Sequence, residues 1–176
     1  MLENWCWDAR VLKRLSKHVT TGEPLPDSLI AAKIAAKNAG TGIFNKRQLF
    51  FATIDQRVHS AEWDASKMNT SDMWSSMWKS LTGIEPSTGN GMASFGHLLG
   101  GYGARYYGYL WSEVYSADMF SLFEKDPFDA AMGRRYRDIV LAHGGQRDSM
   151  DSLVEFLGRK PNNAAFLKSI GLTTTN

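Results

Sequence analysis

The sequence predicts an all-α protein. Apolar residues recur at steps of three and four along most of the chain, and strict alternation of apolar and polar residues is rare. Glycine and proline gather where these periodic segments end. With 176 residues, 43% of them hydrophobic, the chain is long enough to bury a core without disulfides or a structural metal. We therefore expect a single helical unit over residues 1–172.

The first helix is predicted over residues 2–18. Its apolar stripe includes Trp5, Leu12 and Leu15, and Gly22 and the prolines that follow it provide the stop signal. The single cysteine, Cys6, is expected to be a buried free thiol beside Trp5 and Trp7, as in a reducing compartment.

Two further helices are predicted over residues 29–39 and 43–61. Asp27 or Ser28 can cap the first of them, because both side chains accept hydrogen bonds from free amides at a helix start. The glycine at position 40 separates the two helices.

A fourth helix has Asp72 near its start and stops at Gly83, with methionine and tryptophan side chains spaced for core packing. The stretch 83–103 is the most glycine-dense of the chain, so regular structure should break there and form a flexible loop. The remaining helices are predicted at about 104–125, 128–142, 150–157 and 163–170. Residues 173–176 should form a frayed tail.

Charge and cysteine content exclude several classes of function. The chain has 20 Lys and Arg against 18 Asp and Glu, a net charge of +2, and this balance argues against nucleic acid or an anionic membrane as the main partner. A single cysteine excludes a disulfide framework and a cysteine-based zinc cluster within the chain. The sequence shows neither a long apolar run nor a signal-peptide pattern, so we expect a cytoplasmic protein.

The sequence shows no metal-binding motif. His18, His59 and His143 each lack a second ligand at metal-binding spacing, and the H-E-x-x-H pattern is absent. Phosphate-loop, dinucleotide and nucleophile-elbow motifs are absent too. We therefore expect no metal site in this chain.

One group of residues could take part in ligand binding or catalysis. Tyr102, Tyr106 and Tyr109 are spaced i, i+4 and i+7, which would place three phenols on one face of a helix. Phenols stay neutral near pH 7, so they can donate hydrogen bonds to a developing oxyanion. His97 could add a donor or a proton relay.

The glycines before these tyrosines, Gly100 and Gly101, would let the loop approach a ligand closely or close over it. The residues alone leave a second interpretation open. In it, the tyrosines pack a helix against its neighbour with their hydroxyls at the surface, and His97 is an isolated core histidine.

These same residues closely resemble the C-terminal part of the thimet oligopeptidase family, zinc metallo-oligopeptidases that include neurolysin and oligopeptidase A. The resemblance extends over essentially the whole chain. It is carried by Phe95-Gly96-His97-Leu98, Gly100-Gly101-Tyr102, Tyr106 to Glu113, Met1-Leu2-Glu3-Asn4-Trp5, Phe44-Asn45, Arg47-Gln48, Phe156-Leu157-Gly158-Arg159, Pro161 and Phe166-Leu167.

The resemblance implies that the chain is the multi-helix C-terminal part of a zincin-like catalytic domain. In the family, zinc is held by an H-E-x-x-H helix and a later glutamate, all upstream of the segment that matches residues 1–5. We therefore expect a fragment that lacks the zinc site, needs no cofactor of its own, and is inactive alone. The full-length parent would be a zinc-dependent metalloendopeptidase of short peptides, cytosolic or mitochondrial.

The resemblance also assigns roles to residues. Tyr109 would donate to the carbonyl oxygen as it becomes tetrahedral, with help from His97. Tyr102 and Tyr106 would hold the peptide backbone beside the mobile glycine loop, and Glu3 would lie near the zinc site without binding the metal. The chain departs from the family at two loop positions: Gly103, where aspartate is common, and Arg105, where an amide or small residue is common.

A second hypothesis is a stand-alone helical module that binds peptides or a partner without cleaving them. Under the fragment hypothesis, the expected partners are short peptides and the missing catalytic part of the parent. Removing that part should also expose apolar surface around Trp5, Trp7 and the tyrosines, and this surface would favour self-association.

Overall fold

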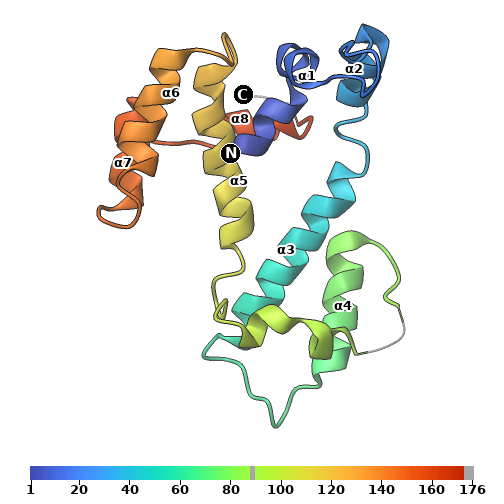
Figure 1. The fold of residues 1–176 in the computed structure, drawn as a ribbon. Coiled ribbons are helices and arrows are strands. Elements are labelled where there is room, and N and C mark those ends of the chain that lie inside the picture. The colour runs from blue at the N-terminus through green and yellow to red at the C-terminus, as the bar shows by residue number, and fades with distance from the viewer. Residues whose placement is uncertain (88–89, 173–176) are drawn as a thin grey trace. The chain divides into compact units, whose positions relative to one another are not determined.

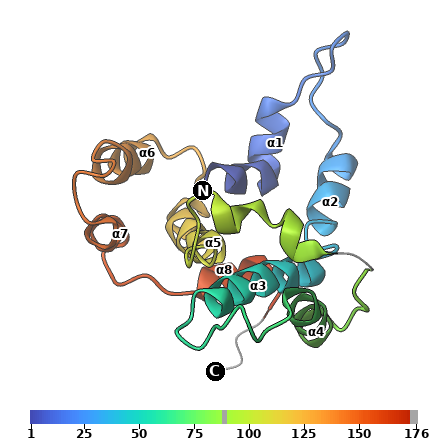
Figure 2. The same cartoon turned by 90° about the horizontal axis from the view of Figure 1, so that it is seen from below.

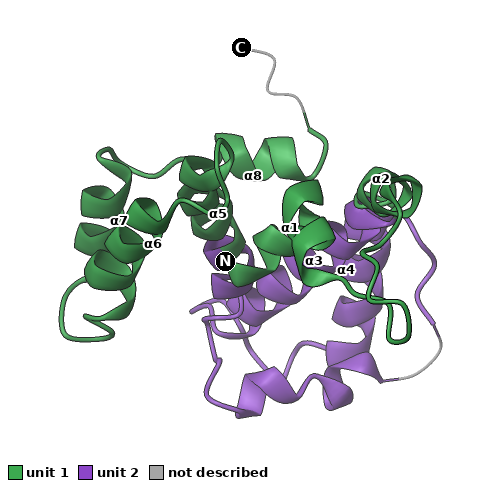
Figure 3. Ribbon diagram, turned by 45° about the horizontal axis from the view of Figure 1, so that its top comes forward, with its two compact units in different colours: residues 1–39, 113–176 green, residues 40–112 purple. Residues whose placement is uncertain are grey.

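The computed structural model describes residues 1–87 and 90–172, and these residues form helices, turns and loops without a β-strand. The predicted all-α class is confirmed. The chain groups into two compact units, residues 1–39 with 113–176 and residues 40–112 (Figure 3). The single helical unit expected over residues 1–172 stays a prediction. The frayed tail predicted for residues 173–176 lies outside the described residues.

The first unit contains the two ends of the described chain (Figure 1). Its elements are the 3-10 helix η1 (Leu2–Trp7), α1 (Ala9–Leu15), α2 (Asp27–Ala35), most of α5 (Gly108–Phe120), the 3-10 turn η4 (Ser121–Phe123), α6 (Ala130–Tyr136), the π-helical turn η5 (Arg137–Leu141), α7 (Ser149–Leu157) and α8 (Ala164–Ser169). The second unit contains α3 (Thr41–Val58), α4 (Thr70–Thr82) and the 3-10 helices η2 (Gly91–Ser94) and η3 (Gly96–Leu99). No helix of the described residues is long and apolar enough to cross a membrane.

The core of the first unit lies between α5, η4 and α7. Phe123 and Phe156 are almost fully buried there, and Trp5 packs edge-on against Phe120 and Phe123, with ring centroids 4.8 Å apart in both pairs. The helices α6 and α7 lie side by side, which Figure 2 shows nearly end on. Burial of these aromatic rings stabilises this unit.

A buried carboxylate ties the last part of the first unit to α5. Asp118 is 1% exposed and accepts hydrogen bonds from Nη1 of Arg159 at 2.8 Å and from the backbone amide of Asn162 at 2.9 Å. Burial by itself raises the pKa of Asp118, but the hydrogen bonds from Arg159 and Asn162 outweigh it and hold the pKa below its ordinary value. The charged form is therefore the one that stabilises this contact.

The core of the second unit lies between α3, α4 and the segment that follows them. Phe50 and Ile54 of α3 are fully buried, and the ring of Phe50 meets Trp74 and Trp78 of α4 edge-on at 4.7 and 5.1 Å. The helix α4 begins at the Asn69 cap and ends at Gly83, in left-handed conformation with φ 75°. The predicted end of this helix and the core role of its tryptophans are confirmed.

Several predicted details are wrong at the helix level, including the cap predicted at Asp27 or Ser28, since Pro26 precedes α2 and no side chain caps it. The helix predicted over residues 2–18 is interrupted at Asp8, whose extended backbone ends η1 and whose carboxylate caps α1 by accepting the amides of Arg10 and Val11. Cys6 is exposed, because η1 turns Trp5 toward the core and leaves the next side chain outside. The helix predicted from about residue 104 begins at Gly108.

Candidate functional site

The chain between η3 and α5 forms a turn instead of the predicted helix. Gly101 has φ +85° and Ala104 has φ +57°, and neither value is compatible with a right-handed helix. Because Tyr102 and Tyr106 lie in this turn, the helical spacing that grouped the three tyrosines is the wrong reason for their proximity. The turn itself brings them together.

His97 and the three tyrosines form one aromatic cluster, which we call the tyrosine cluster. The ring of His97 meets the rings of Tyr102, Tyr106 and Tyr109 edge-on, at centroid distances of 5.3, 5.0 and 5.8 Å. Tyr102 stacks on Tyr109 at 5.6 Å, and Tyr106 lies 4.9 Å from Tyr109. The structure therefore collects the four side chains that the sequence singled out, and His97 is not an isolated core histidine.

Tyr109 is an exposed member of the cluster, and its hydroxyl contacts His97. Its hydroxyl lies 3.4 Å from Nε2 of His97, and its side chain is 41% exposed. A hydrogen bond with Tyr102, together with burial and the charges of the other phenols, raises the pKa of Tyr109 above its usual range. The phenol therefore keeps its proton throughout the neutral range.

Tyr106 differs from the other two tyrosines. It is 6% exposed, and its hydroxyl donates to Oε1 of Gln48 on α3 at 3.1 Å. Burial raises the pKa of Tyr106 and outweighs the opposing effects of Arg47 and Gln48. Its hydroxyl hydrogen is therefore already used, and what it offers a ligand is its ring and an accepting oxygen.

Asp55, a residue that the sequence analysis missed, holds the turn in place. It is 1% exposed on α3, and its two carboxylate oxygens accept the backbone amides of Ala104 at 3.0 Å and Tyr106 at 2.9 Å. The side-chain amide of Gln56 donates to the carbonyl of Ala104 at 2.9 Å. A carboxylate four residues after Phe51, on the apolar face of α3, was the signal in the sequence that could have revealed this role.

His59 completes the support of the turn. Its Nδ1 lies 2.8 Å from the carbonyl oxygen of Asp55 and 3.2 Å from the Asp55 carboxylate. A Cβ atom at Gly103 would lie 2.9 Å from Nε2 of His59, closer than real side chains approach. Gly103, one of the two positions that depart from the family pattern, is therefore a glycine against which the imidazole of His59 packs directly.

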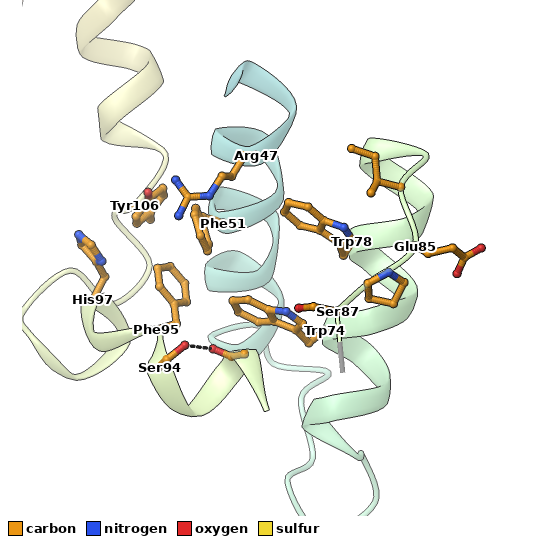
Figure 4. Close-up of a pocket in the computed structure, with 13 residues that line it drawn as sticks. Arg47, Phe51, Trp74, Trp78, Glu85, Ser87, Ser94, Phe95, His97 and Tyr106 are labelled. Carbon is orange, nitrogen blue, oxygen red and sulfur yellow. Dashed lines mark hydrogen bonds between the residues drawn. The ribbon is translucent and has the colours of Figure 1, made fainter. Parts of the chain in front are cut away.

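A cavity of about 650 Å³ opens beside the tyrosine cluster (Figure 4). Four aromatic side chains, Phe51, Trp74, Trp78 and Phe95, make its apolar walls. Its polar lining includes Arg47, Glu85 and His97. Because His97 and Tyr106 line the cavity and also belong to the tyrosine cluster, the two features form one continuous site.

The part of the chain that the structure describes contains no group of three or more His, Cys, Asp or Glu side chains placed to hold a metal ion. The site offers hydrogen-bond donors, aromatic surface and one guanidinium, which suit the binding of a peptide and the stabilisation of negative charge.

Residues 1–172 match the sequence model of Peptidase family M3. The chain is 44% identical to saccharolysin of Saccharomyces cerevisiae over 98% of its length, and 43% identical to the thimet-like oligopeptidase of Dictyostelium discoideum over 98%. It is also 37% identical to oligopeptidase A of Escherichia coli over 97% of its length. These matches cover 25%, 26% and 26% of the relatives, so the chain spans about a quarter of their length. A match that begins at the first residue and continues through the tyrosine cluster to residue 172 shows that the chain belongs to peptidase family M3.

Proposed function

We propose that this chain forms the substrate-binding and oxyanion-stabilising part of a zinc-dependent metalloendopeptidase that hydrolyses short peptides. Family membership supports the reaction class. The observation that carries the assignment to this part is the pairing of Tyr109 with His97 in an accessible aromatic cluster. The catalytic residues proposed here are Tyr109 and His97.

The chemistry follows from the properties of a phenol. When a peptide carbonyl becomes tetrahedral, its oxygen gains negative charge, and a preorganised donor stabilises that charge more than it stabilises the ground state. Tyr109 keeps its proton at neutral pH and is accessible, so it can donate to that oxygen. In this role His97 carries a hydrogen on Nε2 and donates it to the Tyr109 oxygen, 3.4 Å away, so the Tyr109 hydrogen stays available to the peptide oxygen.

The zinc ion belongs to the part of the parent that carries the H-E-x-x-H helix, as the family resemblance implies, and would supply the activated water. The residues of this chain do not ligate it under this proposal. Alone, the chain would bind peptides without cleaving them.

Four residues are proposed to bind substrate. Tyr102, 44% exposed, would contact the peptide backbone through its hydroxyl, and Tyr106 through its ring and accepting oxygen. Gly100 and Gly101 are exposed beside them, so peptide backbone can approach the turn without meeting a side chain.

The proposed partners are short peptides and the remaining part of the parent, in the cytoplasm. Self-association is proposed as well, because large apolar side chains such as Leu99, 96% exposed, lie at the surface. Trp5 contributes little, since it packs against Phe120 and Phe123. Sedimentation velocity tests this: a sedimentation coefficient independent of concentration would remove self-association from the proposal.

The proposed role of Tyr109 is best tested in a hybrid enzyme, in which this chain replaces the matching quarter of oligopeptidase A. Tyr109→Phe removes one donor to the developing oxyanion and should lower kcat about 10²- to 10³-fold, while KM changes little. Tyr107→Phe is the matched control, because Tyr107 is exposed and lies outside the tyrosine cluster. If both variants retained the kcat of the hybrid, Tyr109 would not be the donor.

A further inference from the structure

We propose that the cavity beside the tyrosine cluster binds the C-terminal residue of a peptide. The apolar side chain of that residue would pack against the aromatic wall of the cavity, and its free α-carboxylate would pair with Arg47. The inference rests on the proposed function, since it takes a peptide as the ligand. It specifies that this site binds the C-terminal end of the peptide.

The aromatic walls are preformed. Phe51 stacks on Phe95 with ring centroids 4.7 Å apart, and Trp74 lies 6.0 Å from Phe51. The backbone of η2 lies directly against Trp74, because a Cβ at Gly91 would lie 2.3 Å from Cε2 of the indole. Rings held by such contacts lose little conformational freedom when an apolar side chain packs against them.

The charge of the cavity favours an anion. The guanidinium of Arg47 lies over the ring of Phe51, 4.8 Å from its centroid, and the described residues provide it with no ion pair (Figure 4). Glu85, the carboxylate in the lining, is already paired with Lys79 at 2.6 Å. A planar guanidinium can bind a carboxylate with two parallel hydrogen bonds, and its contact with the Phe51 ring limits its freedom before binding.

A C-terminal residue fits these features better than an acidic side chain does. Its Cα carries both a carboxylate and a side chain, so one residue can engage Arg47 and pack against the rings. An internal aspartate or glutamate would pair with Arg47 but leave the rings without a partner. The cavity, about 650 Å³, is within the usual range for ligand pockets. His97 and Tyr106, which line it, contact Tyr109, so a peptide bound in the cavity would extend toward Tyr109.

Calorimetric titration of this chain with a nine-residue peptide ending in phenylalanine tests the inference. The peptide is used as the free acid and as the C-terminal amide. The acid should bind at least about tenfold more tightly than the amide, because only the acid can form charge-assisted hydrogen bonds with Arg47. Replacing the terminal phenylalanine by glycine in the free acid should also weaken binding, since the rings then lose their contact.

Variants of two arginines on α3 identify the group responsible. Arg47→Gln should bind acid and amide equally, and Arg47→Lys should keep part of the preference because it keeps the charge. Arg57→Gln is the matched control, since Arg57 pairs with Glu62 and does not line the cavity. It should keep the full preference for the acid.

The outcomes separate this inference from the proposed function. Equal binding of acid and amide by the unmodified chain, or an unchanged acid preference in Arg47→Gln, would overturn the inference and leave peptide binding intact. Absence of binding by every peptide would overturn both.

Discussion

At the scale of single residues, Asp55 connects the core of the second unit to the tyrosine cluster. Its carboxylate is fully buried and accepts two backbone amides of the turn that carries Tyr106. Buried acceptors with two donors cannot be replaced without leaving a polar group unsatisfied.

Asp55→Asn should therefore destabilise the chain by about 1–3 kcal/mol, because an amide can accept only one of the two hydrogen bonds and turns its own N–H groups toward the other donor. Urea unfolding measures this loss. Glu62→Gln is the control, since it breaks only an exposed ion pair with Arg57 and should cost less than about 1 kcal/mol. Equal losses in the two variants would show that the turn does not depend on Asp55.

Asp118 predicts how stability depends on pH. Its pKa is held below the ordinary value, so the stabilisation is present above the pKa of the unfolded chain, about 3.9, and is lost as pH falls through the lower folded value. Asp118→Asn should be less stable at pH 7, and the difference from the unmodified chain should shrink below about pH 4.

Unfolding of both proteins in urea at neutral and acid pH checks this expectation. Asp27→Asn provides the comparison, because Asp27 pairs with Lys13 at the surface and should contribute little at either pH. A difference between Asp118→Asn and the unmodified chain that stayed constant with pH would contradict the role of the charged carboxylate.

At the scale of elements, the backbone of η2 packs directly against the indole of Trp74. Gly91→Ala would place a methyl group 2.3 Å from the indole, so Trp74 or η2 must move, at a cost of about 1–3 kcal/mol. Urea unfolding and tryptophan fluorescence report the two effects.

Gly96→Ala is the matched control at the first position of η3, because an added Cβ there meets no atom within 4 Å. It should leave stability and fluorescence unchanged. If Gly91→Ala behaved in the same way, the close packing of η2 against Trp74 would be disproved.

At the scale of the whole molecule, the proposed function predicts that this chain does not cleave peptides by itself. An oxyanion donor lowers the barrier only when a nucleophile is present, and the proposed water-activating zinc lies outside this chain. A quenched fluorescent peptide of about nine residues should therefore stay intact in the presence of the purified chain and added zinc. Cleavage that a chelator abolishes would show that residues of this chain form a metal site.

The sequence by itself determined the helical class, several helix ends and the family. Helical periodicity and stop signals act within a few neighbouring residues, and for this reason Gly83 could be identified as the end of α4. The four members of the tyrosine cluster could be named for a similar reason, since His97 to Tyr109 is one short stretch of chain.

Only the tertiary structure decided how that stretch is shaped. The turn at residues 102–107 replaces a predicted helix because Asp55 binds amides that lie 49 and 51 residues further along the chain. The cavity likewise needs Phe51 of α3, Trp74 of α4 and Phe95 after η2 to meet. Contacts between residues so far apart in the chain leave no local pattern, so the anchor of the turn and the cavity beside it became visible only once the helices were packed.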